Sequence, residues 1–358
     1  MDETLRTAGD LLGTRLHDPV DLGGSPRSTV LRCRTDEGGT VVVKAFEPEP
    51  DSLRGFGAEA AGLALGLAGP RLLGVAPDAA RPLLVMADLG TAPTLADLLL
   101  GDDPKAAVDA LLAWSRGLGR LAAGSVGHRE EFVRATERYA GGRPLWSEER
   151  WVEKATEQLW PVLARLGVDA PPGLAGELAE IAGITDDPYQ GFTPGDTCPD
   201  NNLITPQGLE LIDFETCGYQ SVFLTAAYCR MPFSTCWCVF ELPEQLAQEI
   251  EDTYRAEVTG VFPALAEDAV WEAGVRRAVA AWTVNATTRL TNYPPEQAMH
   301  RSRRPVASAG QVLAHRWRTA EAVTGVEFPA YAETMRRLLE KVASGWDLPR
   351  LPGYPALS

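Results

Sequence analysis

The sequence predicts an α+β protein, with a small antiparallel sheet followed by a large and mostly helical part. Three observations lead to this prediction. Up to about residue 90, short apolar and β-branched runs alternate with glycine-rich turns, as in a meander of strands. Beyond that point, long segments carry apolar residues at helical spacing. A hairpin pattern at residues 195–215 interrupts the helical segments, and its polar residues suggest a functional site.

Length and composition limit the class of protein. The chain has 358 residues, which is enough for two lobes with a substantial core. It carries 33 lysines and arginines against 49 aspartates and glutamates, a net charge of −16. This balance argues against a general nucleic-acid binder and against binding to an anionic membrane. No apolar run approaches the about 20 residues of a membrane span, so no membrane partner is expected.

The N-terminal part should form the sheet. A short helix at 2–12 precedes it, and strands are expected at 19–22, 28–34, 40–46, 71–75 and 82–87. The glycine-rich turn at 23–27 includes Gly24 and Ser25, whose backbone N–H groups would suit phosphates, although a plain β-turn explains it too. The strand 40–46 bears one lysine, Lys44. Glu59 lies among alanines and glycines in a predicted helix at 52–67.

The remainder should be mainly helical. Thr94 and Asp103 are suitable N-caps, and Pro104 suits a first turn. These signals and the apolar spacing predict helices at 94–101, 103–123, 151–166, 174–182, 243–258, 268–289 and 328–345. The acidic residues of 243–258 are expected on a solvated helix face, with binding of substrate amines as the alternative.

The interrupting stretch reads GDTCPDNNLITPQGLELIDFE. Two apolar runs, 202–205 and 209–212, flank a turn at Pro206 and Gly208, which predicts a hairpin. Such a hairpin would bring Asp196, Asn201 and Asp213 to the same end. A carboxylate that receives a hydroxyl proton, next to a carboxylate and an amide that hold Mg²⁺, is what phosphoryl transfer requires. Taken singly, each of the three residues is more simply a turn or strand-end residue.

The stretch resembles the catalytic segment of the aminoglycoside phosphotransferase family, whose relatives include choline kinases and protein kinases. The matching residues are Gly195, Asp196, Pro199, Asn201, Asp213, Phe214 and Glu215. Two positions depart from the family pattern. Pro194 stands where the family has histidine, and Thr225 where it has an aspartate that supports the catalytic loop.

The resemblance implies a two-lobed protein-kinase-like fold, with a nucleotide-binding lobe at 1–88 and a catalytic and substrate-binding lobe at 89–358. It further implies ATP- and Mg²⁺-dependent phosphorylation of a small-molecule hydroxyl. Asp196 would be the catalytic base, and Asn201 and Asp213 would bind the metal. The residues implied in nucleotide binding are Lys44, Glu59, Gly24, Ser25, Met86 and Asp88.

The acceptor stays open at this point. An aminoglycoside-like antibiotic, an amino alcohol, a sugar or another natural product would fit, and the acidic balance is compatible with a cationic one. The alternative is a weak or inactive kinase-like module that binds a protein partner in natural-product or peptide modification; Pro194 and Thr225 motivate it. The polar N-terminus and the six cysteines, none in a Cys-x-x-Cys pair, suggest a cytoplasmic protein with reduced thiols.

Overall fold

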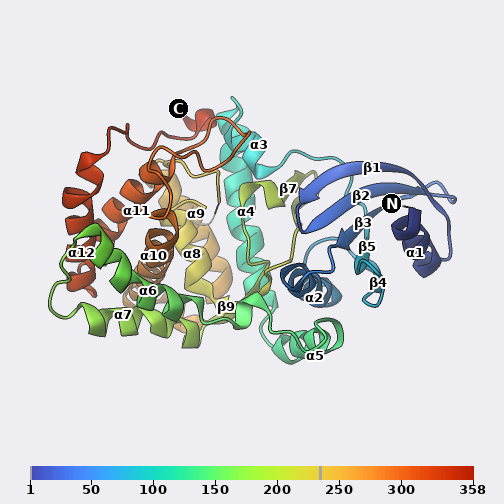
Figure 1. Ribbon diagram of the computed structural model, residues 1–358, viewed down its shortest axis with the longest axis horizontal. Helices are drawn as coiled ribbons and strands as arrows, with labels where there is room; N and C mark the ends of the chain where they lie inside the picture. The colour runs from blue at the N-terminus through green and yellow to red at the C-terminus, as the bar shows by residue number, and fades with distance from the viewer. Residues whose placement is uncertain (1, 234–235) are drawn as a thin grey trace.

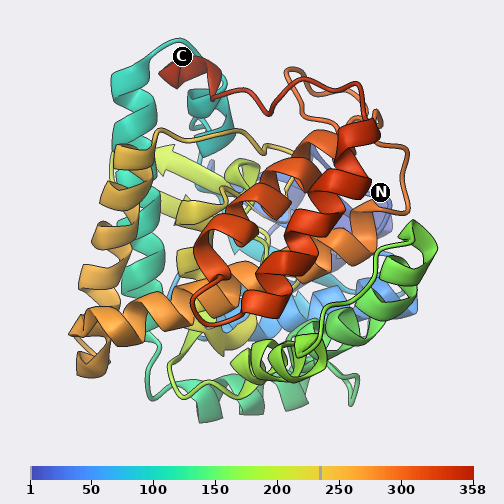
Figure 2. The ribbon, with the colours of Figure 1, turned by 90° about the vertical axis from the view of Figure 1, so that its left-hand side faces the viewer.

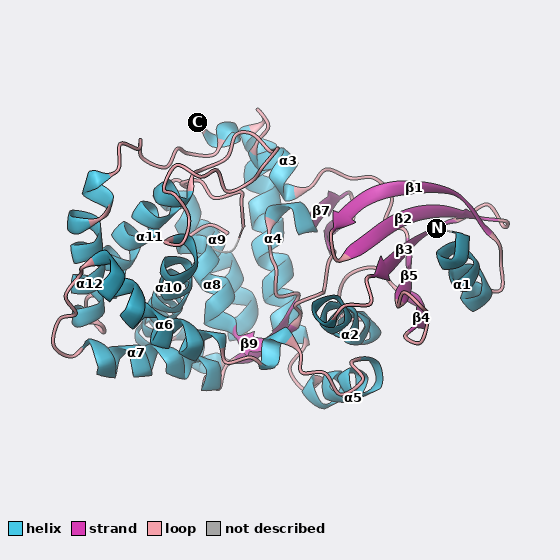
Figure 3. Cartoon of the chain, viewed as in Figure 1, coloured by secondary structure: helices cyan, strands magenta, loops and turns pink. Residues whose placement is uncertain are grey.

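The computed structural model describes residues 2–233 and 236–358. A five-stranded sheet lies at one end of the molecule, and helices make up most of the rest (Figures 1 and 3). The predicted α+β architecture is therefore confirmed. Among the described residues, no helix combines the length and the apolar character that a membrane crossing requires.

The sheet is antiparallel throughout, with strand order β1-β2-β3-β5-β4. Strand β3 is central, and its Lys44 is paired with Val30 of β2 and with Leu84 of β5. All five strands were predicted from the sequence. Their bounds are β1 (Leu16–Ser25), β2 (Ser28–Thr35), β3 (Thr40–Phe46), β4 (Leu72–Ala76) and β5 (Leu83–Ala87).

The two faces of the sheet pack against different cores, because successive side chains of a strand point to opposite sides. Val41, Val43 and Ala45 belong to a small core that includes Ala8 of helix α1 (Asp2–Leu12). Phe46 belongs instead to the large core shared with helix α2 (Pro50–Ala64) and the helical part. Lys44 alternates with Val43 and Ala45, so it shares the face of Phe46. This alternation directs the lysine toward the rest of the molecule.

The helical part is built around α10, which is buried on nearly all sides and contacts α6, α8 and α11. Figure 2 shows α11 and α12 side by side at the end opposite the sheet. The helices are α3 (Leu95–Leu99), α4 (Pro104–Gly124), α5 (Arg129–Tyr139), α6 (Trp151–Leu166), α7 (Leu174–Ala182), α8 (Val222–Arg230), α9 (Glu244–Thr259), α10 (Asp268–Leu290), α11 (Ala309–Thr324) and α12 (Pro329–Lys341).

Two short strand pairs lie between the sheet and the helices. The predicted hairpin is present as β7 (Asn202–Thr205) and β8 (Gly208–Leu211). A second pair, β6 (Gln190–Thr193) with β9 (Gly218–Ser221), was not predicted. Together the pairs bring both ends of the stretch 194–217 close to one another. A boundary between lobes at residues 88–89 stays a prediction; β5 ends at Ala87 and α3 begins at Leu95.

Candidate active site

Lys44 is the centre of a buried ionic cluster. Its Nζ lies 2.7 Å from a carboxylate oxygen of Glu59 on α2, 2.8 Å from Asp213 and 3.0 Å from Glu215. The predicted contact between Lys44 and Glu59 is thus present. Glu215, which was noted in the motif but was not among the predicted site residues, also pairs with Arg27 at 3.1 Å.

The cluster carries more negative than positive charge. Burial opposes the charged form of Lys44, but the carboxylates of Glu59, Asp213 and Glu215 outweigh it and raise its pKa. Burial raises the pKa of Glu59 to about 7, although the neighbouring ammonium group opposes this shift. Oxygen atoms of the three carboxylates all lie within 4.8 Å of one another. A lysine fixed among more carboxylates than it can neutralise leaves oxygen ligands available for a cation.

The loop between β6 and β7 presents Asp196. Gly195 before it has φ 86°, and a Cβ atom there would lie 2.2 Å from the carbonyl oxygen of Thr216. Only glycine fits such a close approach. Burial raises the pKa of Asp196 to about 6, against the hydrogen bond from the Cys198 N–H and the charge of Arg289, which lower it. A carboxylate with this pKa is suited to take up a proton near neutral pH.

The hairpin brings Asn201 and Asp213 together, as its pattern suggested. Asn201 lies just before β7 and donates through Nδ2 to the backbone oxygen of Asp196 over 3.3 Å. Asp213 follows β8 with φ 65°, a left-handed conformation that is uncommon outside glycine. Both residues line one cleft of about 600 Å³ that also contains Lys44 and Glu59, called here the sheet cleft.

The other predicted nucleotide residues, Gly24, Ser25, Met86 and Asp88, line the sheet cleft too. The carboxylate of Asp88 is engaged with Arg32, at 2.8 Å from Nε and 2.9 Å from Nη2. It also accepts the N–H of Gly90. Asp88 therefore orders its own loop through its side chain. His300 and Arg303, from the segment between α10 and α11, line the same cleft and were not among the predicted site residues.

The catalytic loop is held by contacts other than the aspartate of the family pattern. Thr225, at the position where the family has its supporting aspartate, is buried in α8, and the Tyr254 hydroxyl of α9 donates to the nearby backbone oxygen of Val222 over 3.1 Å. Asn202 instead donates to the backbone oxygens of Cys198 and Thr197, over 2.5 and 3.4 Å.

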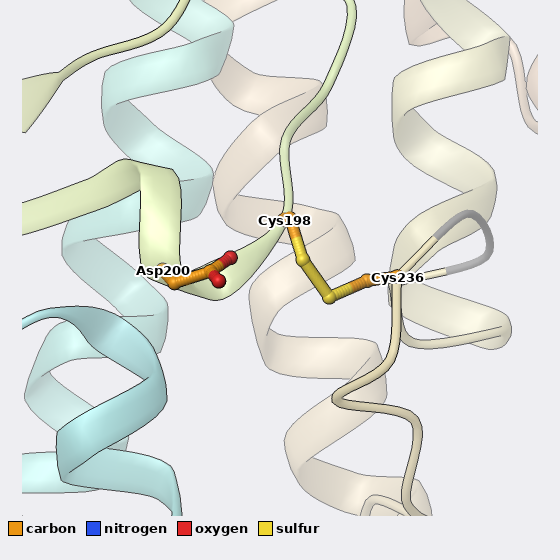
Figure 4. Close-up of side chains that lie close together, drawn as sticks. All are labelled: Cys198, Asp200 and Cys236. Carbon is orange, nitrogen blue, oxygen red and sulfur yellow. A yellow bond between two sulfur atoms is a disulfide. The ribbon is translucent and has the colours of Figure 1, made fainter. Parts of the chain in front are cut away.

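A disulfide adds a covalent link, joining Cys198 to Cys236 with a Cα–Cα distance of 5.2 Å (Figure 4). Asp200, drawn beside it, accepts a hydrogen bond from the Trp237 indole over 3.0 Å. The expectation that all six thiols are reduced is therefore wrong for this pair. The two cysteines are 38 residues apart in the sequence, and their contact depends on how the loops fold, so the sequence alone did not predict it.

Two further cavities open on either side of Asp196. The aromatic cavity, of about 450 Å³, has walls that include Trp146, Trp151, Tyr219 and Trp282. The loop cavity, of about 460 Å³, is lined by the catalytic loop and by the segment 297–300. The acidic residues of α9 line neither cavity: Glu251 pairs with Arg230, and Glu257 with Arg120. The solvated face is confirmed for Glu244, Glu249 and Asp252, which are exposed, whereas Glu251 is buried and Glu257 is half-buried.

The model of the phosphotransferase enzyme family, APH, matches residues 21–257. No match was found among curated protein sequences.

Several solved structures are similar. A macrolide 2'-phosphotransferase from Brachybacterium faecium is 16% identical, with 90% of this chain and 98% of the other covered and a TM-score of 0.47. A putative fructosamine-3-kinase from Thermobifida fusca is 16% identical, with 95% and 99% covered and a TM-score of 0.48. A choline kinase from Cryptosporidium parvum is 10% identical, with 91% of each chain covered and a TM-score of 0.49.

The family match spans about two-thirds of the chain and contains all of the sheet except the first half of β1, together with the Lys44 cluster and the whole catalytic stretch. The small antiparallel sheet and the large helical part agree with the fold that the resemblance implied, and the chain belongs to the phosphotransferase enzyme family.

Proposed function

We propose that this phosphotransferase moves the terminal phosphoryl group of ATP to a hydroxyl of a small organic molecule, with Mg²⁺ as cofactor. What carries the proposal is the arrangement around Lys44. Lys44, held by Glu59, borders the sheet cleft, and Asp196 borders the loop cavity. Asp213, in its left-handed conformation, lines both cavities. Each type of group has a distinct task in phosphoryl transfer.

Lys44 orients the phosphates of the nucleotide, and Glu59 holds the lysine in place. The glycine-rich end of β1, with Gly24 and Ser25, covers the phosphates. The backbone at Met86 to Asp88 lies where the purine ring would rest. All of these residues line the sheet cleft, whose volume of about 600 Å³ suits a bound nucleotide.

The residues present fit a divalent cation. The cluster around Lys44 has three carboxylates against two cationic groups, the ammonium group of Lys44 and the Arg27 guanidinium that pairs with Glu215. Oxygen ligands of this kind are what Mg²⁺ prefers, and Asn201 and Asp213 would hold it. When bound, the ion neutralises charge on the phosphates.

Asp196 orients the acceptor hydroxyl and takes up its proton as the oxygen attacks the terminal phosphorus. The bond to ADP breaks in the same displacement, so ADP leaves with the electron pair. Positioning and electrostatic stabilisation supply most of the rate enhancement in such a reaction.

Titration calorimetry with ATP and Mg²⁺ tests the proposal. Wild type should bind ATP in a Mg²⁺-dependent manner, and Asp213→Asn should weaken binding at least about tenfold because one oxygen ligand loses its charge. Asparagine tolerates the left-handed backbone, so the substitution should fold. Asp109→Asn, on an exposed face of α4, is the matched control and should bind as wild type.

A chain that binds no nucleotide with any divalent ion would contradict the proposal. That result would favour the kinase-like binding module, and a search for a partner protein would follow. Binding of ATP without phosphoryl transfer to any hydroxyl compound would support the nucleotide site and contradict the proposed reaction.

A further inference from the structure

Arg289, near the end of α10, contributes to both cavities beside the catalytic carboxylate. With Asp196 it lines the aromatic cavity and the loop cavity. Its side chain is exposed, and within residues 2–233 and 236–358 it takes part in no ion pair. It is near enough to Asp196 for its charge to lower the pKa of that carboxyl group. An unpaired guanidinium therefore faces the place where the acceptor hydroxyl must lie.

The carboxylates of the same cavities already have partners. Glu149 lies 2.7 Å from Arg54 and 2.8 Å from Lys154. Asp200 accepts the Trp237 indole N–H, and Asp213 pairs with Lys44. Asp196 itself must receive the proton of the hydroxyl. In the aromatic cavity, Arg289 is thus the one charged side chain among the described lining residues, apart from Asp196, that has no ion-pair partner, whereas Asp200 of the loop cavity keeps its negative charge because the indole is neutral.

The aromatic cavity offers flat apolar walls. The rings of Trp151 and Trp282 are stacked on each other with centroids 4.6 Å apart and an interplanar angle of 24°, so one face of each ring is already occupied by the other. Trp146, Tyr219 and Leu224 complete the wall. Flat aromatic faces bind rings and other flat apolar groups, while a guanidinium binds a carboxylate with two parallel hydrogen bonds.

We infer that the acceptor is a hydroxylated organic acid with a flat, mostly apolar body, bound through its carboxylate to Arg289. This inference rests on the proposed function and specifies its substrate class. It replaces the cationic acceptor that the acidic composition allowed. The ring lies against the tryptophans, the carboxylate against Arg289, and the hydroxyl at Asp196.

Three probes of equal shape and different charge provide the test. They are 4-(hydroxymethyl)benzoate, 4-(hydroxymethyl)benzamide and 4-(hydroxymethyl)benzylamine, together with the same series on naphthalene. Phosphorylation by wild type should have kcat/KM at least about tenfold higher for the carboxylate than for the amide, because a charge-assisted pair is lost in the amide. The amine should be the poorest of the three, because its charge repels the guanidinium.

The variant Arg289→Gln should lower kcat/KM for the carboxylate to about that of the amide and leave the amide nearly unchanged. Arg289→Glu should reverse the order, so that the amine becomes the best probe. Arg134→Gln removes one exposed arginine far from the cavities and controls for net charge. ATP and Mg²⁺ binding is measured on the same samples.

The outcomes distinguish a failure of the acceptor inference from a failure of the proposed function. If wild type binds ATP and Mg²⁺ but accepts no probe, or shows no preference for the carboxylate, this inference is overturned and the proposed function stands. An equal loss with all three probes in Arg289→Gln would also overturn it, since the arginine would then act on the transferred phosphoryl group. A protein without nucleotide binding would instead remove the proposed function.

Discussion

Burial disfavours the charged form of Asp196 and raises the pKa of its carboxyl group to about 6. Its protonated form cannot accept the hydroxyl proton. We therefore expect kcat/KM to fall as the pH drops below about 6. Removing Arg289, whose charge lowers this pKa, should move the acidic limb to higher pH. A profile of kcat/KM between pH 5 and 9 checks both expectations. A flat profile below pH 7 would contradict the role of Asp196 as base, and an unmoved limb in Arg289→Gln would contradict the effect of Arg289 on the pKa of Asp196.

The same carboxyl group should cost the protein stability. In the unfolded chain it ionises near its ordinary value of 3.8, so as the pH rises from about 4 to 6 the unfolded state loses its proton first. The folded state is weakened across this window, and the penalty is complete above it. Asp196→Asn should then raise the free energy of unfolding at pH 8 by about 1–3 kcal/mol, and much less at pH 4.

Urea unfolding at the two pH values measures this effect. Asp109→Asn, at an exposed position, is the control and should change stability little at either pH. A variant equally stable as wild type at pH 8 would show that Asp196 ionises at its ordinary pKa.

Residues of the site were predictable where the motif orders them along the chain. Lys44, Glu59, Asn201 and Asp213 come together in the structure as that order implied. The contact of Glu215 with Arg27 and the position of Arg289 beside Asp196 were not predictable. Both join segments far apart in sequence, and an exposed arginine at the end of a helix looks like any solvated charge.

At the scale of elements, the catalytic loop depends on a link that its sequence did not reveal. The disulfide from Cys198 to Cys236 joins the loop to the segment after α8 (Figure 4). Closing a loop of this length restricts the unfolded chain and is worth about 2–4 kcal/mol. We therefore expect a reducing agent to lower the free energy of unfolding of wild type by roughly this amount.

The matched control is the double variant Cys198→Ser/Cys236→Ser. It should have the lowered stability from the outset and should not respond to the reducing agent, which separates the disulfide from other effects of the reagent. Wild type that is indifferent to reduction would show that these two thiols are not joined in solution. A thiol titration of the unreduced, unfolded protein gives the same answer independently.

Elements were predictable where local pattern and turn chemistry agree. The five strands and the hairpin of β7 and β8 follow from alternation and glycine-rich turns. The pair β6–β9 was missed because each strand has only four residues and its partner is a distant segment. Helices α5 and α8 were missed too. Nearly all of α8 is buried, so it lacks the polar face that marks an amphipathic helix.

The whole molecule is arranged so that the sheet cleft draws on both of its parts. Lys44 and Met86 come from the sheet, and Asn201 and Asp213 come from the stretch that the helices surround. The ion pair of Arg27 with Glu215 joins the two parts at the same place. A nucleotide in the cleft must therefore contact both at once.

This arrangement predicts how the protein should melt. A ligand at 100 times its Kd adds about 2.7 kcal/mol to the free energy of unfolding, which for a chain of this size raises Tm by about 4 °C. Because the nucleotide would contact both parts, ATP with Mg²⁺ should shift one cooperative transition as a whole. Asp213→Asn should show a much smaller shift at the same concentrations, since it loses an oxygen charge at the metal. Scanning calorimetry measures whether one transition or two are present. Two separate transitions, of which only the one at lower temperature shifts with ATP and Mg²⁺, would contradict the prediction. In that case the nucleotide would bind the sheet alone, and the helical part would contribute nothing to its site.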